Sequence, residues 1–377
     1  MKFSQIPGLE DLKKVLIKTV DNSHIAHAQL FLGNEGGANL ALALAYATYV
    51  NCLNKQPEDS CGECSSCRKF NKLIHPDLHF IIPTATTKAF SKRSDAISER
   101  FLGEWREFIQ GSPYRRLYDW SSFFGAENKQ CIIPKEESRS IIKALSIKAF
   151  EAEYKVMLIW LPELMQAPAA NAILKILEEP PAKTLFLLVS NNINLLLPTI
   201  ISRTQIVQVR NFNDQEIIQY LKEEKHVSST QAEQIAFLAD GNLRKAVELL
   251  DESGDEVSIF FQEWMRSCFK MDLNTLIQTQ VDAFNTMGKE SQKNLLLYAL
   301  NTLREAMLYK YADESLVRIA SQKTFIENFS KVINENNLPQ LTEVITDAHF
   351  YIERNANPKI TFLALSIKIA RIFRGML

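Results

Sequence analysis

The amino-acid sequence predicts an α/β domain with a mainly parallel sheet, followed by an all-α region that continues to the last residue. Over residues 1–210, short apolar runs alternate with helical patterns, which is typical of parallel β-α units. Several of these runs are apolar throughout, as expected for strands that helices cover on both faces. After Asn211 the strand pattern stops, and helical periodicity continues over the rest of the chain.

Five segments are predicted to form the strands of the sheet. They are residues 28–32 (AQLFL), 77–82 (DLHFII), 155–160 (KVMLIW), 184–190 (TLFLLVS) and 204–209 (TQIVQV). Residues 84–130, which follow the second of these, are too many for a structureless loop, so we predict an insertion with structure of its own. Its aromatic residues favour packing against its own domain, and a docking surface for a partner is the alternative.

Length and composition indicate a globular chain of three domains. Of the 377 residues, 46% are hydrophobic and 23% charged, which excludes a disordered or fibrous protein. We place the domains at residues 1–210, 211–253 and 254–377, since the run DESGDE is typical of a boundary. A formal net charge of −1 excludes a broadly basic nucleic-acid-binding coat. No stretch has the pattern of a signal peptide or a membrane span, so we expect a cytoplasmic protein without membrane contact.

The first predicted strand leads into glycines and then into a helical pattern, in the stretch LFLGNEGGANLALALA at residues 30–45. A functional P-loop, GxxxxGK[ST], binds phosphates with main-chain N–H groups, a lysine and a Mg²⁺-holding hydroxyl. If Gly33 takes the first glycine position, Asn39 takes the position of the lysine. The degenerate loop comprises Gly33, Gly36, Gly37, Ala38, Asn39 and Leu40. Its turn can form, but it lacks the cation and the hydroxyl.

The third predicted strand lacks the acidic pair that positions the metal in an ATPase. In KVMLIWLPEL, Trp160 and Leu161 take those positions, and neither offers the oxygen ligands that Mg²⁺ requires. Glu163 lies beyond the strand end, behind Pro162. Two separate parts of one catalytic arrangement are therefore missing together.

Four of the six cysteines lie close together in the sequence, at Cys52, Cys61, Cys64 and Cys67. In a reducing compartment such a cluster favours a metal over disulfides. Two C-x2-C steps share Cys64 and suit a closed tetrahedral Zn²⁺ site of the structural type, which has no open position for catalysis. An iron–sulfur cluster and metal-free thiols are the alternatives.

The segments NAILKILEEPP (171–181) and LFLLVSNNINLLLPTIISRTQ (185–205) resemble the bacterial clamp-loader subunits of DNA polymerase III, which are AAA+ proteins. The resemblance covers most of residues 1–252, including HIAHAQLFLG (24–33), the cysteine spacing and GNLRKAVELL (241–250). It implies an AAA+ sheet domain of the P-loop type, a small helical lid domain and a C-terminal helical collar. The degenerate P-loop and the missing acidic pair favour the delta-prime type over the ATP-hydrolysing gamma/tau type.

What the resemblance implies about function is specific. By this resemblance we expect that the subunit binds no ATP, is no enzyme by itself, and acts as a stator that donates Arg203 as an arginine finger to the ATP of a neighbouring subunit. Arg203 stands in Ser-Arg-Thr, where the family usually has Ser-Arg-Cys, and Arg244 takes the position called sensor-2. The implied partners are the gamma/tau and delta subunits, the sliding clamp and, through the complex, primed DNA.

Two alternatives stay open. One is an active but atypical clamp-loader ATPase, and the other is a zinc-containing nucleic-acid-binding adaptor outside any clamp loader. Binding of Mg·ATP to the isolated chain distinguishes the first, and co-purification with polymerase subunits distinguishes the second.

Overall fold

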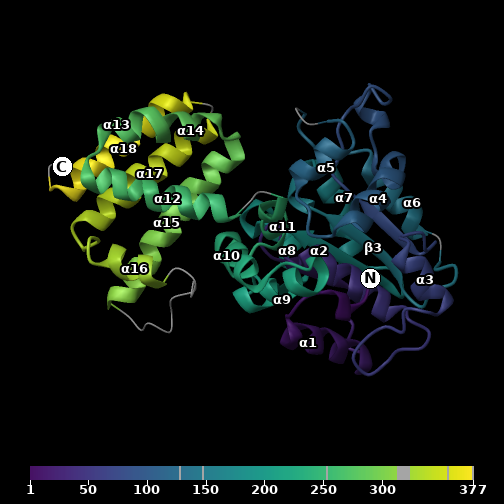
Figure 1. Cartoon of the computed structure of the whole chain (residues 1–377). Coiled ribbons are helices and arrows are strands. Elements are labelled where there is room, and N and C mark those ends of the chain that lie inside the picture. The colour runs from purple at the N-terminus through teal and green to yellow at the C-terminus, as the bar shows by residue number, and fades with distance from the viewer. Residues whose placement is uncertain (127–128, 147, 252–253, 312–322, 355, 376–377) are drawn as a thin grey trace. The chain divides into compact units, whose positions relative to one another are not determined.

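The computed structural model describes residues 1–126, 129–146, 148–251, 254–311, 323–354 and 356–375. The chain forms two compact units, shown in Figure 1. The first unit comprises Met1–Glu216 and Gly241–Arg244, and the second comprises Ile217–Asp240 and Lys245–Leu377. The predicted boundary at residue 253 lies outside the described residues, as do residues 312–322 and 376–377 of the predicted collar. The division into three domains stays a prediction.

A five-stranded parallel sheet forms the centre of the first unit. The strands are β1 (Ala28–Leu32), β2 (Leu78–Ile81), β3 (Lys155–Trp160), β4 (Thr184–Ser190) and β5 (Gln205–Gln208). They lie in the order β2-β3-β4-β1-β5, and each neighbouring pair is parallel. The predicted fold class is therefore confirmed, and the five predicted segments differ from the strands only at the ends of β2 and β5.

Helices surround this sheet. The helical segments of the first unit are η1 (Phe3–Gln5), α1 (Glu10–Asp21), α2 (Asn39–Val50), α3 (Ser65–Asn71), η2 (Arg93–Asp95), η3 (Ser98–Phe101), α4 (Leu102–Gly111), α5 (Leu117–Phe123), α6 (Glu137–Ser146), η4 (Pro162–Leu164), α7 (Ala167–Glu178), η5 (Ile193–Leu195) and α8 (Pro198–Ile201). Two further helices, α9 (Asp214–Lys225) and α11 (Leu243–Asp251), begin in this unit.

Different helices cover the two faces of the sheet. Two successive residues of β1 show this, since successive strand residues point to opposite faces. Leu30 of β1 belongs to the core cluster that includes residues of α6 and α7. The ring of the next residue, Phe31, lies 6.1 Å from that of Tyr46 in α2. Every residue of α2 is buried, which explains why its sequence lacks a polar face. Strands β3 and β4 are buried throughout, as their continuous apolar sequences predict.

The predicted insertion has structure of its own, in α4 and α5, and it packs on the end of β3. Trp105 and Trp120 are fully buried, and their ring centroids lie 5.3 Å apart. The Trp105 ring lies 5.0 Å from that of Trp160, and the Phe108 ring lies 6.4 Å from it. The last residue of β3 is therefore part of an aromatic cluster contributed by the insertion.

The second unit is helical throughout its described residues. It contains the remainder of α9 and α11, together with α10 (Ser229–Ala239), α12 (Gly254–Lys270), α13 (Leu273–Thr275), the π-helix η6 (Leu276–Gln280), α14 (Val281–Thr286), α15 (Lys289–Tyr311), α16 (Lys323–Ser330), α17 (Asn337–Glu353) and α18 (Pro358–Phe373). Trp264 is buried beside Phe362 and donates a hydrogen bond from Nε1 to Ser366 Oγ at 2.8 Å. Among the described residues, no helix has the length and apolarity needed to span a bilayer.

Candidate functional site

The turn between β1 and α2 contains Gly33, Gly36 and Gly37 of the predicted degenerate loop. Gly36 has a φ of +77°, a left-handed conformation that disfavours other residues. The Gly37 main-chain N–H donates to the Asn34 carbonyl at 3.1 Å, and α2 begins two residues later. Leu40 and Ala38 are buried apolar residues. The strand–glycine–helix layout predicted from the sequence is present.

Asn39, at the position aligned with the P-loop lysine, has a buried side chain that is bonded to protein groups. It is 5% exposed, and its Nδ2 donates to Asn191 Oδ1 at 2.9 Å. The same Nδ2 lies 3.4 Å from the carbonyl oxygens of Gly33 and Ser190. Because these interactions occupy the donors of Asn39, the side chain links the start of α2 to the end of β4.

A segment distant in the sequence covers the turn. Asn242 Nδ2 donates to the Glu35 carbonyl at 2.9 Å, and the Arg244 N–H lies 3.4 Å from the Gly36 carbonyl. A Cβ atom on Gly36 would lie 2.1 Å from Asn242 Oδ1, so the contact leaves no room for a side chain at this glycine. Asn34 Nδ2 donates to Asn211 Oδ1 at 2.9 Å. The loop is therefore held by protein groups on the side where Gly241–Arg244 lies.

The position of the metal-binding acidic pair is filled as well. Trp160 is 3% exposed and packs on the insertion, and Leu161 is 3% exposed. Glu163, which follows them in the sequence, accepts a hydrogen bond on Oε1 from the Asn191 main-chain N–H at 3.0 Å. Burial raises the pKa of Glu163, which favours the neutral acid over the anion that Mg²⁺ prefers.

Arg244, at the sensor-2 position, is paired with the insertion. Its Nε and Nη2 donate to Oδ2 and Oδ1 of Asp119 in α5, both at 2.9 Å. The side chains of Arg244 and Asp119 are 21% and 12% exposed, so this two-point ion pair is largely shielded from water. Asp119 Oδ2 also accepts a hydrogen bond from the Arg116 main-chain N–H at 2.8 Å. The insertion thus supplies an internal carboxylate to Arg244.

The Asp119–Arg244 pair makes stability depend on pH. Burial by itself would raise the pKa of Asp119, but the hydrogen bonds from Arg244 and the Arg116 main chain lower it from 3.8 to about 2. Because the folded-state pKa lies below the unfolded-state value, the stabilisation is complete above about pH 4 and disappears between about pH 4 and pH 2. A shift of this size corresponds to about 2 kcal/mol.

Asp119→Asn is therefore expected to lower the free energy of unfolding by about 2 kcal/mol at pH 7, and the difference from the parent chain should shrink as pH falls below 4. Denaturation followed by tryptophan fluorescence measures this, since three of the four tryptophans, Trp105, Trp120 and Trp160, lie in the first unit. Asp282→Asn is the matched control, since its ion pair with Lys359 is exposed and contributes little. A difference that persists unchanged at pH 2 would contradict the assignment.

Arg203 lies in the turn between α8 and β5 and is 32% exposed. Its Nε donates to Glu178 Oε1 at the end of α7 at 2.9 Å, and its Nη2 donates to the same oxygen. Its Nη1 donates to the Thr199 carbonyl at 2.9 Å. The structure therefore brings the arginine of the SR pair directly onto the LEEPP helix end, two motifs that are adjacent in space but 25 residues apart in the sequence.

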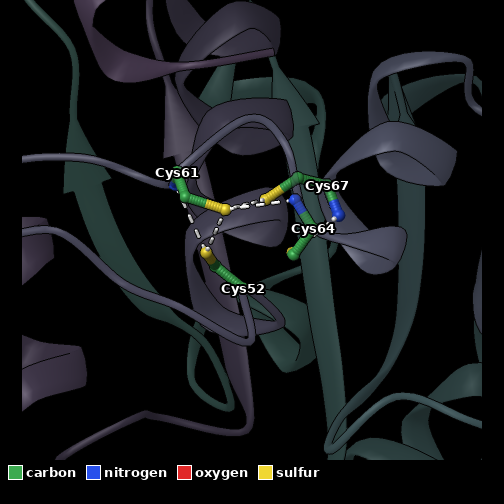
Figure 2. Close-up of side chains that lie close together, drawn as sticks. All are labelled: Cys52, Cys61, Cys64 and Cys67. Carbon is green, nitrogen blue, oxygen red and sulfur yellow. Dashed lines mark hydrogen bonds between the residues drawn. The ribbon is translucent and has the colours of Figure 1, made fainter.

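The four clustered cysteines lie together, as Figure 2 shows. Their sulfur atoms all lie within 4.8 Å of one another, and Cys61 Sγ is 3.6 Å from Cys52 Sγ and 3.9 Å from Cys67 Sγ. A tetrahedral site with Zn–S bonds of about 2.3 Å requires sulfur separations of about 3.8 Å. The arrangement could therefore hold a metal ion of this type.

Main-chain N–H groups also point at these sulfur atoms. Cys52, Cys61 and Cys64 each accept an N–H···S hydrogen bond at 3.3 Å, from residues 61, 64 and 67 respectively. The Cys64 N–H lowers the pKa of the Cys61 thiol to about 6, whereas burial raises the pKa of Cys52 and Cys67. A bound cation would favour the thiolate form of these ligands against the effect of burial.

Sequence reasoning missed four residues of these sites. They are Asp119, Glu178, Asn191 and Asn242. Glu178 and Asn242 lie within the segments LEEPP and GNLRKAVELL and could have been singled out there. Asp119 carried no signal, because an exposed-looking aspartate in an insertion does not reveal a partner 125 residues away.

Comparison with known proteins gives consistent matches. A family model described as "DNA polymerase III, delta subunit" matches residues 8–213. The chain is 24% identical over 395 residues to DNA polymerase III subunit tau of Bacillus subtilis, covering 98% of this chain and 62% of that one. It is 28% identical over 236 residues to DNA polymerase III subunit delta' of the same organism, covering 63% of this chain and 57% of the relative. The chain thus spans less than two thirds of either relative.

Among solved structures, a gamma subunit-related protein of DNA polymerase III from Thermotoga maritima matches with a TM-score of 0.36 and 16% identity. The match covers 96% of this chain and 100% of that one.

Proposed function

The chain belongs to the family of DNA polymerase III delta subunits, and from this membership we propose that it is a clamp-loader subunit of the delta-prime type. In this role it hydrolyses no ATP of its own and acts as a stator beside gamma/tau and delta subunits. The complex then loads the sliding clamp onto primed DNA. The relatives' names, which are those of DNA polymerase III subunits, support these partners.

The observation that carries the proposal is the side chain of Asn39. An ATP-binding loop needs a mobile cation at this position, but Asn39 is buried, and its amide is bonded to Asn191. The contact of Asn242 with Gly36 and the ion pair between Arg244 and Asp119 support the same conclusion. The side chains at the positions of the lysine and of sensor-2 are thus both bonded to protein groups.

Equilibrium binding of Mg·ATP to the isolated chain tests this proposal. We expect no saturable binding in the millimolar range, both for the parent chain and for the variant Asn39→Lys with Leu40→Ser. The restored lysine and hydroxyl are insufficient because Asn242 and Asp119 still hold the loop and Arg244. Tight binding by the parent chain would favour the atypical ATPase instead.

In the proposed complex, Arg203 acts on the ATP of a neighbouring subunit. A planar guanidinium that stays charged can meet the charge developing on γ-phosphate oxygens. Partial exposure and a position in a turn support this use, since a finger must reach beyond its own chain. Arg244 would then have a structural role, holding the insertion to Gly241–Arg244.

We further propose that the cysteine cluster holds one structural Zn²⁺. Four sulfur ligands complete a tetrahedral shell and leave no position for water, so the metal would stabilise and not catalyse. The segment 52–67, which holds the cluster, also contains Asp59. Its carboxylate accepts hydrogen bonds from the N–H groups of Phe3 and Ser4 at 3.0 and 2.9 Å. Metal binding would therefore also fix the segment at η1.

A further inference from the structure

The partly exposed guanidinium of Arg203 donates several hydrogen bonds within its own chain. A guanidinium has five N–H donors in a rigid plane. Nε and Nη2 both donate to Glu178 Oε1, and Nη1 donates to the Thr199 carbonyl. Nη1 also lies 3.3 Å from Ser202 Oγ, a longer contact. The plane is thus held from one side by a carboxylate and from the other by a main-chain carbonyl.

These contacts leave a defined part of the guanidinium available. Glu178 takes the side formed by Nε and Nη2, so Nη2 keeps one N–H, and Nη1 keeps one that only the long Ser202 contact engages. Nη1 and Nη2 are the two terminal nitrogens of the side chain, and each keeps one N–H outside the contacts to Glu178 and Thr199; we call this pair the terminal fork. Such a fork matches two oxygens of one phosphate group.

We infer that Glu178 is a positioning residue, which fixes the guanidinium of Arg203 so that its terminal fork is presented to a phosphate on a neighbouring subunit. The inference rests on the proposed function, because it concerns the same arginine finger. Glu178 touches neither the nucleotide nor the reacting atoms; it acts through Arg203 alone. The LEEPP helix end and the SR pair would then form one working unit.

The exposure of the pair supports a role in orientation more than in stability. The side chains of Arg203 and Glu178 are 32% and 50% exposed, and ion pairs this accessible to water contribute little to folding. A residue whose removal leaves the fold intact can still matter for catalysis, because a misplacement of about 1 Å can lower a rate about 10²-fold. Variants at Glu178 should therefore fold and assemble normally.

The test uses the complex reconstituted with gamma/tau and delta subunits, with single-turnover ATP hydrolysis to resolve the site that this chain serves. Glu178→Ala is expected to slow that site about 10- to 100-fold, with KM for ATP unchanged within about twofold. Glu178→Gln, which keeps an acceptor oxygen, should retain part of the lost rate. Glu104→Ala removes an exposed carboxylate on α4 that has no ion pair among the described residues, and it should change nothing.

A double-mutant comparison shows whether Glu178 acts only by positioning Arg203 or has an effect of its own. On the Arg203→Ala background, Glu178→Ala should have no further effect, because residues that act as one unit are not additive. An additional loss there, or faster turnover in Glu178→Ala alone, would overturn the inference. If Arg203→Ala itself left turnover unchanged, the proposed function would fail; if only Glu178→Ala did so, the inference alone would fail.

Discussion

Arg203→Ala is expected to slow ATP hydrolysis by about 10³- to 10⁵-fold at the neighbouring site that this chain serves, the effect of removing an arginine finger in related phosphoryl-transfer proteins. The reason is electrostatic: without the guanidinium, the proposed site would lose a positive charge that meets the charge developing on the γ-phosphate oxygens. Single-turnover hydrolysis in the reconstituted complex should show that site as a separate slow phase, and clamp loading onto primed DNA should fall with it.

Two controls make this result interpretable. Arg203→Lys keeps the positive charge but loses the planar fork, so it should recover only a small part of the rate. Arg139→Ala removes another exposed arginine of the first unit, on α6, and should leave turnover unchanged. Size-exclusion chromatography confirms that each complex is intact. Normal ATP turnover in an intact Arg203→Ala complex would contradict the proposed role of Arg203 as an arginine finger.

Cys64→Ser is expected to reduce bound zinc from one ion per chain to none and to lower stability by several kcal/mol, because binding energy at a structural zinc site is folding energy. The loss should appear as a fall of about 10 °C in the unfolding temperature, since about 1 kcal/mol corresponds to 2–4 °C in a unit of this size. Metal analysis and a thermal scan measure the two effects.

Cys64→Ser removes a proposed zinc ligand without disturbing the start of α3. Cys64 is the N-cap of α3 and accepts the Cys67 N–H, and serine is itself a favourable N-cap, so the helix start is preserved while the thiolate is lost. Cys131→Ala removes a buried cysteine outside the cluster and should keep one zinc. A purified parent chain that is free of metal and equally stable would rule the site out.

The sheet could be predicted from the sequence because its evidence is local. Strands such as β3 and β4 are buried on both faces, and their sequences are apolar at every position from 156 to 160 and from 185 to 189. The degenerate loop could be recognised for the same reason, since the absence of a lysine at Asn39 is a fact of one position. The ends of β2 and β5 differed by a residue because pairing, not propensity, ends an edge strand.

The substitute contacts of the loop could not be predicted. Asn39 had several polar candidates as partners, and only the packing of β4 beside β1 brings Asn191 to it. The pairing of Arg244 with Asp119 depends on where an insertion folds, which composition does not specify. Pairs of this kind are determined by tertiary structure. A sequence pattern can therefore single out a residue such as Asn39 or Arg244, but it does not reveal which side chain that residue contacts.

The contact between Asn242 and the Glu35 carbonyl joins residues 207 positions apart. During synthesis, the glycine turn must therefore remain uncovered until residues far downstream have left the ribosome, and closing so large a chain loop makes this a late folding event. A fragment ending at Glu216 would contain the five strands of the described sheet but would lack Gly241–Arg244, the segment that covers the glycine turn of the same unit. Such a fragment should be the protease-sensitive form of the molecule, and adding the missing stretch back should protect it.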